Sequence, residues 1–381
     1  MKALVFERSL PRYAAARVAS SFRAGAGAWA GPLKLAEIEP PELPGPGWHR
    51  VRPRLAGICG SDLATVDGRS SRYFEPIVSF PFVPGHEVVG ELDDGSRVVI
   101  EPVLKCAARG VNPPCEWCAA GMTNRCERTA FGHLEPGLQT GYCTDTGGGW
   151  SIALVAHDSQ LHAVPETMSD EAAVMVEPAA CAVHAAASVG DGEVAVIGAG
   201  TLGLCTIAAL RYFGTPAVVI AAAKHPEQRA LARQLGADVV VEPDEVDRAV
   251  RRTVGSSLVA GDQLTHGADA VVDCVGSDDS IAQALRVVAP GGTVHLVGMP
   301  GRVSVDLTGL WHREVSLRGA YAYTSDDFAR AFELVEAKQL DRLVSALYPL
   351  DRFHEAIEHA AEAGRRGAVK IAFDLRNERH R

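Results

Sequence analysis

The feature that most constrains the fold is a glycine-rich turn between two apolar segments. Residues 194–197 read Val-Ala-Val-Ile, the next six residues match G-x-G-x-x-G, and the apolar segment that follows extends to Phe213 with a single charge. A strand, a tight turn and a helix in this order are typical of a site where a pyrophosphate binds at the helix N-terminus. The glycines have no side chains, so the pyrophosphate can approach the backbone closely. We therefore predict a dinucleotide site that includes Gly198, Ala199, Gly200, Thr201, Leu202 and Gly203.

The sequence around this turn alternates between strand-like and helical segments from about residue 183 onward. Strands are predicted at residues 194–197, 217–221, 270–273 and 293–297, the last after the turn Pro290-Gly291-Gly292, and helices at 201–213, 226–235 and 280–288. Alternation of this kind gives parallel βαβ units and a doubly wound sheet. The fold class is thus α/β for this part of the chain.

The first third of the sequence has a different pattern. Short strand-like segments at residues 51–55, 88–92 and 97–100 are separated by stretches rich in proline and glycine, which is typical of a small β-barrel. Residues 9–32 are rich in Ala, Ser and Gly without a clear period, and we predict a loop insertion there. After about residue 326 the chain is helix-rich and then ends in a strand at 369–373.

Composition excludes several classes of partner. A net charge of −10 and a pI near 5.7 argue against nucleic acid, whose phosphates would be repelled. The apolar run 194–210 contains three glycines and is short for a membrane helix, and the apolar start ends at Glu7 and Arg8, before the length of a signal peptide. Nine cysteines, four of them crowded into one segment, point to metal binding in a reducing compartment, so we expect a cytoplasmic protein with no membrane partner.

The crowded cysteines have the spacing of a metal site. Cys115 and Cys118 are separated by two residues, Cys126 follows after seven more, and eight residues separate Cys106 from Cys115. Four thiolates at short spacing suit a closed, tetrahedral structural zinc site. Because the first gap is long, Cys106 has to reach the others from a loop.

A second, more dispersed set of potential metal ligands carries a family resemblance. It consists of Cys59, followed by Ser61 and Asp62, then the pair His86-Glu87, and finally Glu177 before a proline. As an ordered set upstream of a dinucleotide site, these residues resemble the zinc-dependent medium-chain dehydrogenase/reductase family. The resemblance covers nearly the whole chain, including residues 313–319, and favours the polyol, glucose and threonine dehydrogenase-like branches.

This resemblance implies a fold, a domain order and a set of roles. It implies a GroES-like β-barrel catalytic domain over residues 1–182, a Rossmann domain over 183–323 and a return to the catalytic domain over 324–381. Cys59, His86 and Glu177 are then the catalytic zinc ligands, and Glu87 is a neighbouring carboxylate that can approach the metal. Ser61 takes the place of the proton-relay hydroxyl. The expected cofactors are one catalytic and one structural Zn²⁺ and a nicotinamide dinucleotide.

The choice of nicotinamide cofactor is predicted from the end of the second strand. NAD enzymes carry an acidic residue about 20 positions after the glycine motif, where it binds the ribose 2′-hydroxyl. That position holds Ala223, followed by Lys224 and His225, with Arg229 one helical turn further on. Without a carboxylate and with cations nearby, we expect NADP(H) to be preferred over NAD(H).

The predicted activity is hydride transfer between this cofactor and a small alcohol or carbonyl substrate such as a polyol, a sugar alcohol or a secondary-metabolite ketone. Zinc polarises the substrate oxygen, and Ser61 passes the proton towards solvent. Two alternatives remain open: a zinc-free quinone or enone reductase of the same superfamily, and a non-catalytic NADPH-binding redox sensor. The family resemblance also implies a homo-oligomer, either a dimer or a tetramer.

Overall fold

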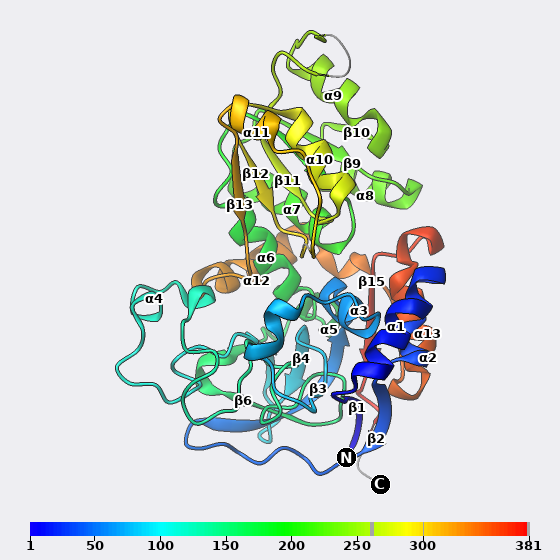
Figure 1. The fold of residues 1–381 in the computed structure, drawn as a ribbon. Coiled ribbons are helices and arrows are strands. Elements are labelled where there is room, and N and C mark those ends of the chain that lie inside the picture. Colours follow the sequence, from blue (N-terminus) through cyan, green and yellow to red (C-terminus); the bar gives the residue numbers. More distant parts are fainter. Residues whose placement is uncertain (260–262, 300, 379–381) are drawn as a thin grey trace. The chain divides into compact units, whose positions relative to one another are not determined.

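The structure is a computed structural model that describes residues 1–259, 263–299 and 301–378 (Figure 1). The chain divides into two compact units, one formed by residues 1–177 together with 323–381 and the other by residues 178–322. Within the described residues, no helix has the length and apolar character needed to cross a bilayer.

Residues 178–322 form a parallel six-stranded sheet in the order β10-β9-β8-β11-β12-β13 (Figure 1). The chain starts in the middle of the sheet and reverses direction between β8 and β11, which is the strand order of the Rossmann fold. Helix α7 packs with α8, and α9 packs with α10. The strands are β8 (Glu193–Ile197), β9 (Val218–Ala222), β10 (Val239–Val241), β11 (Ala268–Asp273), β12 (Val288–Leu296) and β13 (Ser316–Gly319), and the helices are α7 (Thr201–Phe213), α8 (Pro226–Leu235), α9 (Val246–Thr253), α10 (Asp278–Val287) and α11 (Thr308–His312). The predicted doubly wound sheet is confirmed.

The sequence prediction was wrong about the turn before the fifth strand of this sheet. Strand β12 begins at Val288 and runs through Pro290-Gly291-Gly292, so these residues lie inside the strand. Gly291 has a positive φ of 74°, and the pairing with β11 shifts register in this region. Pro and Gly here form an irregularity within a paired strand, which a local turn signal does not distinguish from a true turn.

The other unit is built on a mostly antiparallel sheet in the order β14-β15-β3-β4-β5-β7, with β6 also paired to β3 and a separate hairpin of β1 and β2. This is the GroES-like barrel that the resemblance implied. The strands are β1 (Lys2–Phe6), β2 (Leu33–Glu37), β3 (Trp48–Gly57), β4 (Val88–Glu91), β5 (Arg97–Ile100), β6 (Leu154–His157), β7 (Leu161–Ala163), β14 (Val344–Tyr348) and β15 (Lys370–Asp374). The helices of this unit outside residues 9–32 are α3 (Gly60–Val66), α4 (Glu116–Ala119), α5 (Asp170–Ala173), α12 (Ser325–Lys338) and α13 (Phe353–Ala361). Helix α6 (Val176–Ala186) contains the boundary between the two units. Short 3₁₀ turns lie at Arg72–Ile77, Thr123–Arg125, Asp158–Gln160, Pro243–Glu245, Leu340–Leu343, Leu350–Arg352 and Ala363–Arg366.

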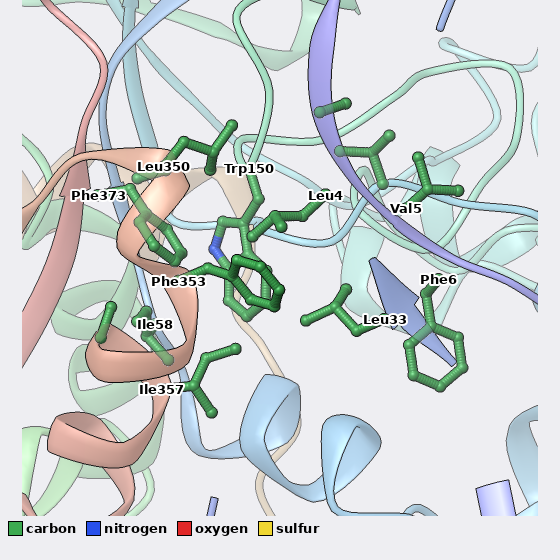
Figure 2. Close-up of a cluster of buried hydrophobic side chains, with 14 of the residues drawn as sticks. Leu4, Val5, Phe6, Leu33, Ile58, Trp150, Leu350, Phe353, Ile357 and Phe373 are labelled. Carbon is green, nitrogen blue, oxygen red and sulfur yellow. The ribbon is translucent and has the colours of Figure 1, made fainter. Parts of the chain in front are cut away.

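The core of the barrel unit joins both ends of the chain. Trp150 is fully buried among apolar residues that include Leu4 from β1, Phe353 from α13 and Phe373 from β15 (Figure 2). The rings of Trp150 and Phe373 meet edge to face, with centroids 5.3 Å apart. The indole nitrogen donates a hydrogen bond to the carbonyl oxygen of Gly57 at 3.2 Å. Burial of these large side chains therefore fixes the C-terminal segment to the barrel.

Residues 9–32 were predicted to be a loop, and this prediction was wrong. They form helices α1 (Leu10–Phe22) and α2 (Gly27–Ala30). Only Ala16 of α1 is buried, so the helix lacks the apolar periodicity that would reveal it. Its alanines favour helix, and tertiary contacts hold the insertion: the backbone N–H groups of Gly25 and Gly27 each donate to the carboxylate of Asp67 at 3.1 Å.

Candidate metal and cofactor sites

Cys59 lies at the start of a short helix that also carries its neighbours in the predicted site. It is the N-cap residue of α3, and its backbone N–H donates to the carboxylate of Asp62 at 3.0 Å. This reciprocal capping arrangement fixes the first turn of the helix. Ser61 follows in the same turn, half-buried, and its carbonyl oxygen accepts a hydrogen bond from Thr65 at 2.9 Å. The proton-relay role of Ser61 stays a prediction.

His86 lies beside Cys59 in the interior of the barrel unit. Its Nδ1 is 3.4 Å from Oδ1 of the buried Asp62, and the hydroxyl of Tyr142 donates to that same carboxylate oxygen at 3.3 Å. Burial lowers the pKa of His86, but the charge of Asp62 and hydrogen bonds to Asp62 and Cys59 outweigh it and hold the pKa well above its usual value. A carboxylate on one ring nitrogen orients a metal-binding imidazole through the other.

Glu177 lies in the first turn of α6 and interacts with His86 and Glu87. Tyr323, which is fully buried, donates its hydroxyl hydrogen to Oε1 of Glu177 at 3.0 Å. Burial raises the pKa of Glu177 to about 7; the charge of His86 opposes this rise, and the charge of Glu87 adds to it. His86 thus interacts with the side chain of Cys59 and with the charge of Glu177. A thiol, an imidazole and a carboxylate are a donor set that fits catalytic zinc with an open position.

Glu87 forms a buried ion pair that the sequence analysis missed. Its Oε2 contacts Nζ of Lys370, and each side chain is 2% exposed. Lys370 is the first residue of β15, nearly three hundred positions downstream, and Nζ also donates to the carbonyl oxygen of Ile58 at 3.3 Å. The distance along the chain hides this contact from any local pattern.

The four predicted structural ligands meet in one cluster. The thiol sulfurs of Cys106, Cys115, Cys118 and Cys126 all lie within 4.8 Å of one another, and the described residues contain no other equally tight group of three or more potential ligands. Backbone N–H groups donate to these sulfurs, including that of Cys115 to Cys106 at 3.4 Å. Burial raises the pKa of Cys115, but such backbone donors, at Glu127 and Cys118, help lower it to about 7. Four convergent thiols with backbone donors fit a tetrahedral zinc ion.

Cys106 reaches this cluster because a buried arginine orders the long loop behind it. Arg109 is fully buried, and its guanidinium group donates to a ring of backbone carbonyl oxygens. The acceptors belong to Leu104, Phe131, Leu134, Glu135 and Gly137. The guanidinium therefore ties the two ends of residues 104–137 together.

The glycine-rich turn has the geometry expected of a dinucleotide site. Gly198 has a φ of 90°, which favours glycine, and a Cβ added at Gly203 would lie 1.8 Å from the Gly198 carbonyl oxygen. Gly200 is the N-cap of α7, and a Cβ added there would meet no atom within 4 Å. The turn is thus closely packed towards the protein and open at Gly200, where a pyrophosphate would approach. The flanking residues Ala199, Thr201 and Leu202 complete the turn and the first turn of α7.

The end of β9 carries the residues predicted to select the cofactor. Ala223 is buried, Lys224 is exposed and His225 is the N-cap of α8. Arg229 donates to the carbonyl oxygens of Ala223 at 3.2 Å and Lys224 at 3.0 Å, and it pairs with Glu242 at 3.2 Å. Glu242 follows the neighbouring strand β10, so a carboxylate does lie beside this corner. This contact depends on the parallel pairing of β10 with β9, so no local sequence pattern revealed it.

Comparisons with known proteins agree with this geometry. Residues 45–166 match the alcohol dehydrogenase GroES-like domain, and residues 201–337 match the zinc-binding dehydrogenase domain. Sorbitol dehydrogenase of Arabidopsis thaliana is 30% identical over 91% of this chain and 94% of its own length. L-idonate 5-dehydrogenase of Vitis vinifera is 29% identical over the same shares.

A solved structure supports the same assignment. A zinc-binding dehydrogenase of Sinorhizobium meliloti with NADP bound superimposes with a TM-score of 0.70 and 26% identity, covering 90% of this chain and 96% of that one. The sequence matches, the two domain types and the converging potential ligands lead to one assignment. The chain belongs to the zinc-type medium-chain dehydrogenases, in the branch of the polyol dehydrogenases.

Proposed function

We propose that this dehydrogenase uses zinc and NADP(H) to interconvert a polyol, or a related secondary alcohol, with the corresponding carbonyl compound. The observation that supports the proposal most directly is that His86 interacts with both Cys59 and Glu177 in a protein from this family. The activities named for the sorbitol and idonate dehydrogenases support the choice of substrate class.

Each residue of the site has a distinct part in this chemistry. Cys59, His86 and Glu177 would hold the metal, while the carboxylate of Asp62 would orient His86 through its ion pair and Tyr323 would orient Glu177 through its hydrogen bond. A bound zinc ion would supply Lewis acidity at the substrate oxygen, and a bound nicotinamide would supply the hydride chemistry. Ser61 would carry the substrate proton towards solvent when the alcohol is oxidised.

The direct test is turnover by the purified protein on a panel of polyols, secondary alcohols and ketones with both cofactors. We expect activity that is lost on removal of zinc, and lost in His86→Asn while NADPH still binds. Activity on quinones or enones that survives metal removal would show a zinc-free reductase instead. NADPH binding without turnover on any panel member would indicate a binding protein or redox sensor.

The four cysteines are proposed to hold a second, structural zinc ion. Metal analysis of freshly purified protein should then approach two zinc ions per chain. Cys106→Ser should lower this number towards one, since a structural site needs its fourth ligand. A value near one that Cys106→Ser leaves unchanged would contradict the second site.

The preference for NADP(H) that we propose rests on the absence of a carboxylate at Ala223 and on the exposed Lys224 beside it, since Arg229 is paired with Glu242. A carboxylate at this position would face the 2′-phosphate, and two unit charges 4 Å apart interact by about 4 kcal/mol at an effective dielectric of 20. Even after solvent screening, about 1.4 kcal/mol is a tenfold change in affinity. Comparing kcat/KM for both cofactors, with Ala223→Asp as the matched variant, tests the preference. A wild-type preference for NAD(H) would overturn it.

The remaining expectations concern the organisation of the protein. We propose that residues 183–323 act as the nucleotide-binding domain between the two catalytic segments 1–182 and 324–381. We also propose a cytoplasmic homo-oligomer, a dimer or a tetramer. Light scattering after size-exclusion chromatography measures the molar mass directly, and a monomer at micromolar concentration would contradict the assembly.

A further inference from the structure

A fully buried carboxylate, that of Glu101, has no part in the function proposed so far. It directly follows strand β5. Three groups from three parts of the barrel unit contact it: Lys105 at 2.7 Å, His162 of β7 at 3.0 Å and Ser325 of α12 at 3.1 Å. Burial raises the pKa of Glu101, but the hydrogen bonds and charges of His162 and Lys105 outweigh it and lower the pKa. The carboxylate therefore joins segments that lie far apart in the sequence.

Ser325 is the residue through which the C-terminal segment contacts this carboxylate. It is the first residue of α12, and its hydroxyl accepts a hydrogen bond from Nζ of Lys105 at 2.8 Å. The same hydroxyl donates to Oε1 of Glu101 at 3.1 Å, so it acts both as an acceptor and as a donor. Breaking a buried ion pair is strongly destabilising, and the pair of Lys105 and Glu101 therefore fixes the place that the hydroxyl takes.

Lys105 connects Ser325 to the loop of the four cysteines. It immediately precedes Cys106 in the sequence, and its carbonyl oxygen accepts a hydrogen bond from the N–H of Arg109 at 3.2 Å. Arg109 is the buried arginine whose guanidinium group ties together the two ends of residues 104–137. The contacts that order the cysteine loop therefore also place the ammonium group of Lys105.

Tyr323 lies two residues before Ser325 and contacts the predicted zinc ligand Glu177. Its hydroxyl donates to Oε1 of Glu177 at 3.0 Å. Thr324, between the two, is the N-cap of α12 and forms a reciprocal capping box, which fixes this short segment locally. The ring of Tyr323 packs against that of Phe328 in the same helix, with centroids 5.1 Å apart. A displacement of Ser325 would therefore also displace the Tyr323 hydroxyl.

We propose that Ser325 is a positioning residue that couples the loop of the four cysteines to the catalytic site. Its hydroxyl keeps Tyr323 in the place from which Tyr323 holds Glu177. The inference rests on the proposed zinc-dependent function. It gives the cysteine loop a second role, because disorder in that loop would weaken retention of the catalytic zinc as well as of the structural one.

The test is a double-mutant cycle between Ser325 and Tyr323, measured as zinc release from the holoenzyme into a chromogenic chelator. Tyr323→Phe removes a direct partner of a metal ligand, and such a loss weakens metal binding about 10- to 100-fold. Ser325→Ala displaces the same partner without removing it, so the catalytic zinc should leave about 3- to 10-fold faster than from wild type. In the double variant zinc should leave no faster than in Tyr323→Phe, because Ser325 acts only through the hydroxyl that is already absent.

Two variants serve as controls, and a third assigns the metal. The release phase that is absent from His86→Asn belongs to the catalytic zinc. Ser325→Thr keeps the hydroxyl and should release zinc like wild type. Ser20→Ala is the matched control, because its half-buried hydroxyl donates to the carbonyl oxygens of Arg17 at 3.1 Å and Asp67 at 3.0 Å and has no contact with Glu101. Its loss should leave zinc release unchanged.

Cys106→Ser tests the coupling to the cysteine loop, because it disturbs the proposed structural site. The catalytic zinc should then leave faster than from wild type. In the Tyr323→Phe background, Cys106→Ser should cause no further acceleration, since the coupling ends at the Tyr323 hydroxyl. Should Cys106→Ser not fold, the cycle between Ser325 and Tyr323 still decides the proposal.

Release of the catalytic zinc at the wild-type rate from Ser325→Ala would overturn the inference. Effects of Ser325→Ala and Tyr323→Phe that multiply in the double variant would overturn it as well, because independent losses are what a purely structural contact would show. Equal acceleration by Cys106→Ser with and without the Tyr323 hydroxyl would also count against it. Failure of the underlying function has a different signature: the wild-type protein would then have no zinc-release phase that depends on His86.

Discussion

Gly203 is the glycine of the predicted cofactor site where an added side chain would clash most closely with the backbone. In Gly203→Ala the new Cβ would start 1.8 Å from the carbonyl oxygen of Gly198, whereas real contacts need at least 3.0 Å. The start of α7 must therefore move away from the β8 turn by more than about 1 Å, in an interior packed too densely to absorb the shift. Overpacking of this kind costs about 1–3 kcal/mol of stability.

The same displacement moves the backbone N–H groups that would face the pyrophosphate. We expect the Kd for NADPH, measured by fluorescence titration, to rise about tenfold or more, which is a loss of about 1.4 kcal/mol or more. The melting temperature of the cofactor-free protein should fall in parallel. Wild-type values for both quantities in Gly203→Ala would refute the reasoning.

Gly200→Ala is the matched control, because its Cβ would meet no atom within 4 Å. The cofactor-free variant should keep its stability to within about 1 kcal/mol, a margin that allows for the poorer N-cap. Its affinity for NADPH should nevertheless fall, since the methyl group occupies the approach to the pyrophosphate. Undiminished NADPH binding by this variant would show that the pyrophosphate does not lie against Gly200.

Three further predictions concern other parts of the molecule. Tyr323→Phe removes the hydroxyl that donates to Glu177, so zinc affinity and kcat should each fall about 10-fold or more, as metal titration and kinetics would show. Arg109→Met leaves a ring of buried carbonyl oxygens without donors and should lower the free energy of unfolding by about 3 kcal/mol in urea; a loss below about 1 kcal/mol would contradict this. Burial and the charge of Arg318 lower the pKa of His295 to about 4, below its value near 6.5 in the unfolded chain, so stability should be lost as pH falls from 6.5 towards 4. His295→Gln should remove at most about 3 kcal/mol of that pH dependence, which melting curves across this range would measure.

Local sequence signals were sufficient to predict the secondary-structure elements of the proposed cofactor site. The strand, glycine turn and helix around Gly198 follow from short-range steric rules, and the helix predicted at residues 226–235 coincides with α8. The four cysteines could be grouped from spacing alone, because their ligand atoms come from one ordered loop. In each case the residues that cooperate are close in the sequence or belong to a strong periodic pattern.

Helices α1 and α2 show where such signals fail. Their sequence lacks an apolar stripe, and their position depends on contacts with Asp67 and the end of α3. Glu242 was missed for a related reason, since only the parallel pairing of β10 with β9 brings it to Arg229. Strand order is a property of the whole sheet, and a linear pattern does not contain it.

The sequence by itself determined the family, the two types of domain and the chemical nature of the predicted ligands. Only the tertiary structure decided how those ligands are held: Tyr323 against Glu177, and Lys370 against Glu87. Both partners come from the C-terminal part of the chain, which returns to the barrel because β15 pairs with β3 and the core around Trp150 buries it. Contacts that depend on strand register and shared burial join residues far apart in sequence, and for that reason they become visible only in the folded chain.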